Sequence, residues 1–267
     1  MPGRKKAEQL SALHVYINMM GSNGKIDRFS FLADTFLVDK NGMVRPTTLC
    51  CYMISCALRH AEARGFGATD SLGWVLARMA LHIERVPAWR ECFYIETWVR
   101  NLYHGFTDRC VRVVDEDGNE IASMLCTLAM IDLKTRSSVD LNGDIGLRLN
   151  ECMEPNEPLA IKKIPAISRM SIDDVAFKHT PRYSDVDING HMNSIRYLDH
   201  ILDYLPTEYM NTHILTDFVV AYMKEGDATE ELAFGIKELE ENRFLVQVTK
   251  ENGTIALRSE LKFLSKE

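Results

Sequence analysis

Residues 183–200, which read YSDVDINGHMNSIRYLDH, gather acidic, amide and imidazole side chains that could do chemistry. Asp185, Asp187 and Asn189, with a glycine next, match the opening of an EF-hand calcium loop. Position 12 of such a loop must supply a bidentate glutamate, but Arg196 stands there. The positively charged arginine cannot coordinate Ca²⁺, so we expect neither a metal ion nor a cofactor in this stretch.

A second interpretation is that the stretch only begins a helix. Asp and Asn cap helix N-termini, and glycine allows a tight turn. Capping accounts for Asn189 or Asn193 and for Gly190, but it gives no reason for a histidine or for two acids. The catalytic interpretation uses them all. Asp187, Asn189 and His191 alternate along an extended approach, so their side chains can lie on one side of the chain, and the helix start offers backbone N–H groups to an oxyanion.

The elements around this stretch form a pattern that occurs twice along the chain. In the first half, residues 26–38 alternate like a strand, and residues 47–63 read as a helix that is apolar on almost every side and should be buried. In the second half, residues 172–183 read as a strand, and residues 192–205 form an amphipathic helix that Pro206 ends. Four strand-like runs follow each helix: 74–84, 92–100, 106–114 and 121–131 in the first half, and 214–223, 231–238, 243–250 and 254–264 in the second.

A short sequence match supports this duplication. DKNGM at 39–43 and DINGH at 187–191 each precede the helix of their half, at an offset of 148 residues. Met43 then stands where His191 stands, so the first unit would lack the histidine. A helix wrapped by a curved antiparallel sheet, repeated in tandem, is the double hot-dog arrangement, and we therefore predict an α+β fold of this kind. Edge-to-edge pairing of the two sheets would cover strands that otherwise stay exposed.

This pattern divides the chain into four parts. Residues 1–25 are an N-terminal extension, 26–138 a first hot-dog unit, 139–170 a linker and 171–267 a second unit. The linker is predicted because its region contains prolines and glycines and lacks clean periodicity. The chemistry is expected mainly in the second unit, which has the histidine.

Composition excludes several classes of protein. A net charge of −7 and a pI near 5.7 argue against a general nucleic-acid binder. The longest apolar run, residues 49–58, is shorter than the roughly 20 residues that span a bilayer, and no signal peptide is recognisable. The seven cysteines show no metal-ligand spacing, and most lie in apolar runs, so we expect them to be reduced. These features predict a cytoplasmic protein that binds neither nucleic acid nor membranes.

The second half resembles the acyl-acyl-carrier-protein (acyl-ACP) thioesterases, the plant-type enzymes and their bacterial relatives. The family motif D-x-N-x-H is matched by Asp187, Asn189 and His191. A helix that contains Tyr197 and ends near Pro206 follows, as it does in the family.

A second family motif lies further along the chain. The family carries an aromatic-x-basic-Glu stretch 38 residues beyond the motif aspartate, and YMKEGD places Glu225 at that spacing. Gly226 follows where the plant enzymes often have cysteine, which argues against a cysteine nucleophile. The first half also resembles the family, in the segment RGFGATDSLGWVLARMALHIERVPAWRECFYIETWV and in the strand AMIDLKTR. The likeness therefore covers roughly residues 26–265.

The resemblance implies an activity and a set of catalytic residues. The activity is hydrolysis of fatty acyl thioesters on acyl carrier protein during fatty acid biosynthesis, without a cofactor. The catalytic set is Asp187, Asn189, His191 and Glu225. In one route Glu225 is the general base on water; in another Asp187 attacks first and forms an acyl-enzyme anhydride. The sequence does not decide between the two routes.

The resemblance also implies where the substrate and its carrier lie. In the family the acyl chain occupies largely the first unit, although ordinary core packing would use the same apolar residues. The candidates for substrate binding are Phe66, Trp74, Met79 and Trp98. Acyl carrier protein is acidic, so a basic docking patch is expected, although a solvated charged face would look the same. The candidates for that patch are Lys162, Lys163, Arg169, Lys178 and Arg182.

Three other functions stay open at this stage. An acyl-CoA thioesterase of the same fold would use the same residues with a different carrier. A hot-dog hydratase or dehydratase is less consistent with the motif, because those enzymes typically show D-x-N-P-x-H, and the proline is absent here. A non-catalytic acyl-binding module is disfavoured by the complete set of four residues. The oligomeric state is open, with a homodimer as one option.

Overall fold

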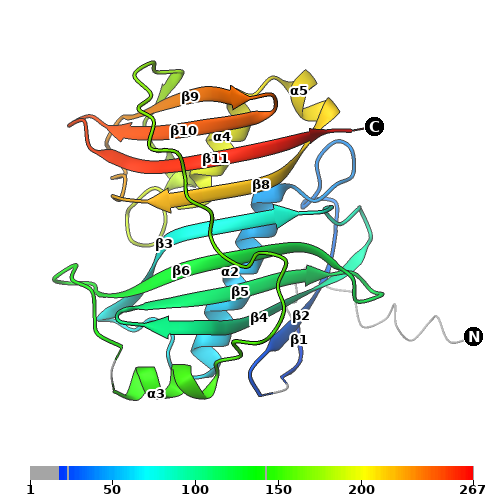
Figure 1. Ribbon diagram of the computed structural model, residues 1–267, viewed down its shortest axis with the longest axis vertical. Helices are drawn as coiled ribbons and strands as arrows, with labels where there is room; N and C mark the ends of the chain where they lie inside the picture. The colour runs from blue at the N-terminus through cyan, green and yellow to red at the C-terminus, as the bar shows by residue number, and fades with distance from the viewer. Residues whose placement is uncertain (1–17, 23, 142, 267) are drawn as a thin grey trace, which may run out of the picture.

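The computed structural model describes residues 18–22, 24–141 and 143–266, so most of the extension at 1–25 lies outside the described residues. The described strands form one 11-stranded antiparallel sheet in the order β1-β2-β4-β5-β6-β3-β8-β11-β10-β9-β7. Helices α2 and α4 lie behind this sheet in Figure 1, and a long irregular segment crosses its front. No helix in the described part of the chain is both long and apolar enough to cross a bilayer.

The first half supplies six strands and one long helix. Its elements are β1 (Asn18–Ser22), β2 (Asp27–Leu32), α2 (Pro46–Ala63), β3 (Leu72–Ile83), β4 (Cys92–Tyr103), β5 (Phe106–Val114) and β6 (Glu120–Asp132). The second half repeats this order with smaller helices. Its elements are β7 (Phe177–His179), the 3-10 turn η1 (Tyr183–Asp185), α4 (Arg196–Tyr204), α5 (Thr207–Thr212), β8 (His213–Tyr222), β9 (Leu232–Glu240), β10 (Arg243–Lys250) and β11 (Ile255–Ser265). The predicted tandem hot-dog fold is confirmed.

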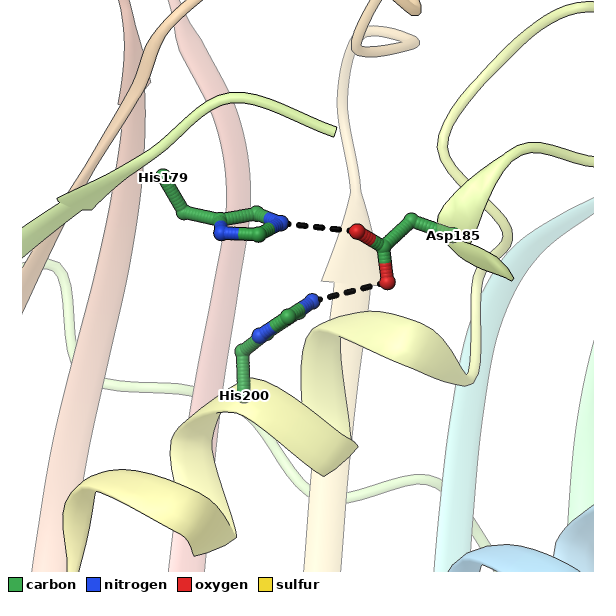
Figure 2. Close-up of side chains that lie close together, drawn as sticks. All are labelled: His179, Asp185 and His200. Atoms are coloured by element: carbon green, nitrogen blue, oxygen red, sulfur yellow. Dashed lines mark hydrogen bonds and ion pairs between the residues drawn. The ribbon is translucent and has the colours of Figure 1, made fainter. Parts of the chain in front are cut away.

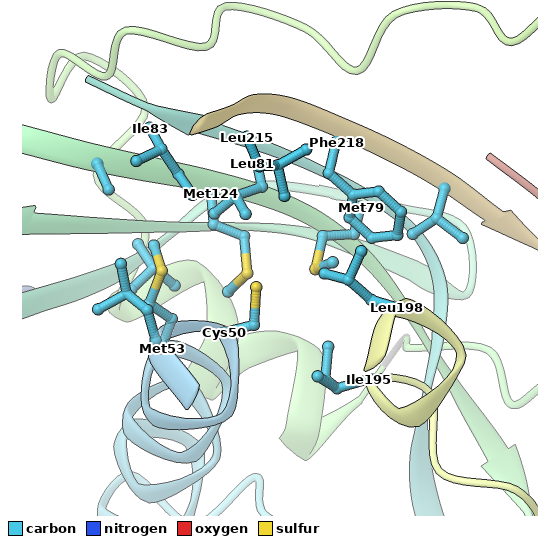
Figure 3. Close-up of a cluster of buried hydrophobic side chains, with 14 of the residues drawn as sticks. Cys50, Met53, Met79, Leu81, Ile83, Met124, Ile195, Leu198, Leu215 and Phe218 are labelled. Carbon is cyan, nitrogen blue, oxygen red and sulfur yellow. The ribbon is translucent and has the colours of Figure 1, made fainter. Parts of the chain in front are cut away.

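The two halves join where β3 pairs with β8. The register runs from Arg78 opposite Ala221 to His82 opposite Asp217, and Nδ1 of His82 lies 2.9 Å from the carboxylate of Asp217. Phe218 is fully buried at this junction. Figure 3 shows that side chains from α2, β3, β6, α4 and β8 meet in one core. The expected edge-to-edge pairing is therefore present, and the two units share their interior.

Helix α2 is buried on one side only. Pro46 opens it, and Leu49, Cys50 and Met53 are fully buried against the sheet. The expectation that the whole helix is buried is wrong for the opposite side, where Leu58 is 41% exposed. Leu58 lines a cavity described below, which gives a reason for an apolar residue on that side.

Three other predicted elements differ from the structure. The strand expected at 172–183 is limited to β7, because the chain turns at η1. The helix expected at 192–205 begins only at Arg196, because the side chain of Asn193 accepts the N–H of Ile195 and holds a turn there. The linker contains the helix α3 (Asp144–Glu151), and the segment that follows α3 crosses the outer face of the sheet.

Candidate active site

The stretch DINGH forms a closed turn. The backbone N–H of Asp187 donates to the carbonyl of His191 over 2.8 Å, and Gly190 donates back to Asp187 over 3.0 Å. Oδ1 of Asp187 accepts the N–H groups of Asn189 and His191 at 2.8 and 3.2 Å. Gly190 has φ of +80°, which favours glycine. The expected extended approach, with three side chains alternating, is therefore wrong.

The stretch DKNGM forms the same turn in the first unit. Asp39 donates to the carbonyl of Met43 over 2.8 Å, and Gly42 donates to Asp39 over 3.0 Å. Oδ1 of Asp39 accepts the N–H groups of Asn41 and Met43 at 2.8 and 3.1 Å. Each hydrogen bond that closes the DINGH turn has a counterpart here. The duplication inferred from five residues is confirmed in its hydrogen bonds.

The same comparison identifies the counterpart of Glu225. The N–H of Met192 donates to Gly226, and the N–H of Val44 donates to Pro87, both over 2.9 Å. Val86, the residue before Pro87, therefore corresponds to Glu225. The first unit has apolar side chains at the positions of both His191 and Glu225, and it keeps the aspartate and asparagine of the turn.

His191 and Glu225 lie close together in the second unit. Nε2 of His191 is 3.6 Å from Oε2 of Glu225 and 3.8 Å from Oδ1 of Asp227. The other carboxylate oxygen of Glu225 forms an ion pair with Arg136, from the turn that follows β6. Lys250 donates to the backbone carbonyl of Glu225 over 2.8 Å. The first unit therefore contributes a cation to the acidic residue of the second.

His191, Glu225 and Arg136 border a cavity of about 630 Å³. All four predicted catalytic residues line it, together with apolar side chains of α2, β3 and β6. The apolar lining residues include Ile54, Leu58, Trp74, Leu76, Met124, Leu128 and Ile131. The cavity is thus polar beside Glu225 and largely apolar beyond it, which suits a ligand with one reactive end and a hydrocarbon chain.

The structure separates the four predicted substrate-binding residues. Trp74 lines the cavity, and its indole N–H donates to the carbonyl of Phe66 over 2.9 Å. Phe66 and Met79 are buried in the core and do not line the cavity. Trp98 packs with Leu159 under the linker, in a different cluster from the core shared by the helices.

A buried arginine lines the cavity and was not anticipated from the sequence. Arg109 is 2% exposed, and its only hydrogen-bond partner among the described residues is Nδ1 of His60, 2.8 Å away. The other ring nitrogen of His60 donates to the carbonyl of Lys25. Burial lowers the pKa of Arg109 to about 10, so the guanidinium stays charged at neutral pH. The sequence could have indicated it, because Arg109 alternates with Thr107 and Val111 along β5 and so shares their buried face.

Cysteine chemistry is not supported at this site. All seven cysteines are free, and Cys126 alone among them lines the cavity. Burial raises the pKa of Cys126 far above that of a reactive thiol, so the nucleophilic thiolate is suppressed.

The five basic residues expected to form a docking patch are all exposed. Lys178 is already paired with Glu231 over 2.7 Å. None of the five lines the cavity.

Gly226 is fixed by a close approach of Tyr197. A Cβ atom at position 226 would lie 2.6 Å from the hydroxyl oxygen of Tyr197. Burial raises the pKa of Tyr197 to about 12, although a hydrogen bond from the backbone of Gly226 acts to lower it. The glycine is thus a packing requirement beside Glu225.

Comparisons with known proteins agree with this geometry. Residues 28–147 match the family model described as acyl-ACP thioesterase N-terminal domain, and residues 171–264 match the acyl-ACP thioesterase C-terminal domain. The chloroplastic dodecanoyl-[acyl-carrier-protein] hydrolase of Cinnamomum camphora is 28% identical over 222 residues, which cover 77% of this chain and 57% of that protein. This chain spans about half the length of the curated relatives it matches.

Two solved structures share the fold. An acyl-ACP thioesterase from Bacteroides thetaiotaomicron is 38% identical with a TM-score of 0.82, and the match covers 92% of this chain and all of that one (100%). The 12:0-ACP thioesterase from Umbellularia californica has the same TM-score, 0.82, and the same coverage at 20% identity.

The contact between Gly226 and Tyr197 gives a stability prediction. Gly226→Ala should lower the free energy of unfolding by about 1–3 kcal/mol, because the new methyl group must displace the Tyr197 hydroxyl. In a Tyr197→Phe background the same change should cost less, since the obstructing oxygen is gone. Urea unfolding of the four proteins measures both costs, and equal costs in the two backgrounds would contradict this explanation.

Proposed function

This chain belongs to the acyl-ACP thioesterase family, and on that basis we propose that it hydrolyses fatty acyl-ACP to free fatty acid and acyl carrier protein. The observation that carries the proposal is the pair of His191 and Glu225 at the polar end of a largely apolar cavity. An acyl chain in the cavity would place its thioester beside these two side chains.

In the proposed reaction Glu225 acts on water directly. Glu225 takes a proton from a water molecule, and the water oxygen attacks the thioester carbonyl carbon. The carbon–sulfur bond then breaks, and the proton reaches the leaving sulfur through Nε2 of His191. The products are a carboxylic acid and the thiol of the carrier. The ion pair with Arg136 holds Glu225 at the cavity mouth.

The duplicated turn favours this route over attack by Asp187. Both oxygens of Asp187 contact its own turn: Oδ1 accepts two backbone N–H groups, and Oδ2 lies 3.4 Å from the amide of Asn189. Asp39 makes the same contacts in the first unit, beside Met43, which has no acid–base chemistry. We therefore assign Asp187 to closing the turn that carries His191.

We assign the backbone N–H of Ser194 as the hydrogen-bond donor to the negatively charged oxygen that forms on the attacked thioester carbonyl. Ser194 lines the cavity just before α4, and its N–H has no acceptor among the described residues. The neighbouring N–H groups of Asn193 and Ile195 are already bonded within the chain. A free N–H near the helix start stabilises negative charge on the attacked carbonyl oxygen.

The cavity extends from the second unit into the first. Its lining runs from Glu225 after β8, across β3 and β6, to Arg109 on β5. Neighbouring strands lie about 4.8 Å apart, so these three steps span roughly 14 Å. The charged guanidinium of Arg109 disfavours an apolar chain end beside it, which limits the length of acyl chain that fits.

Carrier docking is proposed at the cavity mouth. Ile188 lines the cavity and is fully exposed, and Tyr183 nearby in the chain is exposed to the same degree. Lys224 and Arg136 add positive charge beside Glu225, which suits an acidic carrier protein. We also propose a cytoplasmic location, on the ground that all seven cysteines are free.

Removing the proposed base tests the reaction. Glu225→Gln should lower kcat for acyl-ACP hydrolysis by about 100- to 10,000-fold, because the amide cannot take a proton from water. Release of the carrier thiol measures the rate. Glu231→Gln is the matched control, since Glu231 pairs with Lys178 away from the cavity, and it should keep normal turnover. A folded Glu225→Gln variant with ordinary turnover would refute the assignment.

The two turns allow a matched test of Asp187. Asp187→Asn keeps an oxygen that can accept the two N–H groups, so kcat should stay within about tenfold of the unaltered protein. Asp39→Ala and Asp187→Ala should each lower the free energy of unfolding by about 0.5–2 kcal/mol, but only the latter should reduce turnover. If Asp187→Asn loses as much activity as Glu225→Gln, Asp187 is the nucleophile.

The carrier is tested by comparing substrates of one chain length. We expect kcat/KM to be about tenfold or more higher for acyl-ACP than for acyl-CoA, because only the protein carrier can cover Ile188 and Tyr183. The Glu225→Gln variant provides the background rate for both substrates. An equal or higher value for acyl-CoA would identify the protein as an acyl-CoA thioesterase.

A further inference from the structure

Behind the DINGH turn, three side chains from different elements converge on one point. His179 ends β7, Asp185 ends η1, and His200 lies on α4. Figure 2 shows the two imidazoles pointing at separate oxygens of the Asp185 carboxylate. Nε2 of His179 is 2.8 Å from Oδ2, and Nε2 of His200 is 2.9 Å from Oδ1.

The carboxylate of Asp185 is buried and ionised. It is 4% exposed, and burial alone would raise its pKa. Hydrogen bonds from the backbone N–H of Arg182 and from the two imidazoles outweigh burial and lower the pKa to about 2. Both carboxylate oxygens have partners, with Arg182 and His179 at Oδ2 and His200 at Oδ1.

We propose that His179, Asp185 and His200 bind a divalent transition-metal ion of the zinc type. Two imidazole nitrogens and a carboxylate oxygen are donors that such ions prefer. The ligand atoms lie within 4.8 Å of one another, and in the described part of the chain no other group of three His, Cys, Asp or Glu side chains is arranged this way. The ion replaces the two imidazole–carboxylate hydrogen bonds, and each neutral imidazole binds it through Nε2 and carries its single proton on Nδ1.

The surroundings of the three ligands fit a bound ion. The backbone N–H of Arg182 holds Oδ2 of Asp185 at 2.8 Å, as outer hydrogen bonds commonly orient metal ligands. The ring of Phe234 lies 6.4 Å from that of His200, which gives the site an apolar wall. The side chains of His179 and His200 are 13% and 21% exposed, so water can supply the fourth ligand.

The ion would be structural rather than catalytic. None of the three ligands lines the cavity. The carbonyl of Asp185 accepts the N–H of Asn193 over 2.7 Å, so the cluster is bonded to the base of the turn that carries His191. A metal ion at this point joins β7, η1 and α4 and stabilises that base.

Zinc titration of the chelator-treated full chain tests the proposal. Calorimetry should show one equivalent of Zn²⁺ bound, and His200→Gln should weaken binding by about 100-fold or more, because an amide replaces an imidazole ligand. Glutamine keeps an N–H donor for Asp185, so the variant should still fold. His82→Gln, at the other histidine–aspartate contact, and His191→Gln, beside Glu225, are the controls and should bind Zn²⁺ normally.

Two further measurements make the outcome decisive. Zn²⁺ should raise the Tm of the unaltered protein and of both controls, but not that of His200→Gln. Co²⁺ in place of Zn²⁺ should give the visible absorption of a four-coordinate site that His200→Gln lacks. Failure of the unaltered protein to bind Zn²⁺, or equal binding by His200→Gln, overturns the proposal and leaves a hydrogen-bonded cluster only.

Discussion

The pairing of β3 with β8 is the constraint on which the site depends. It makes one sheet from two units, so a cavity that begins at Glu225 after β8 can continue across β3 and β6 of the first unit. It also brings Arg136, at the end of the first unit, into an ion pair with Glu225. Neither unit alone contains both the acid–base pair and the apolar lining. The edge pairing therefore covers exposed strands and assembles the site at once.

The two equivalent turns separate what the fold needs from what the chemistry needs. Asp39 and Asp187 close their turns with the same hydrogen bonds, so the aspartate is explained by local backbone structure alone. What differs is the pair that faces the cavity in the second unit, His191 and Glu225, at positions where the first unit has Met43 and a valine. The first unit therefore shows that the turn forms without the acid–base groups, so His191 and Glu225 are not needed for the fold of the turn.

Much of the fold could be predicted because its signals are local. Helix α2, the strands that follow each helix and the repeated turn all arise from periodicity or turn residues within one segment. The differences arise where contacts between segments decide. Helix α4 begins late because Asn193 caps a turn before it. Helix α3 is short, and burial of Leu149 in a cluster with Phe66 and Leu141 fixes its position. Both of these partners lie outside the helix, so its own sequence does not predict it.

In the candidate site, too, features with a sequence signal could be predicted, whereas features set by contacts between distant segments could not. The family resemblance selected four residues that do line one cavity, but it could not place the apolar candidates. Trp98 reads like a pocket residue because both faces of β4 are buried around it, and its outer face is buried because Leu159 of the linker packs there. Arg136 carries no local signal, since its partner lies in the other unit. Arg109 does carry one, because a buried cation on a strand needs either a partner or a function, and its only described hydrogen-bond partner is the neutral His60. Breaks in a hydrophobic pattern are therefore more informative about this cavity than the pattern itself.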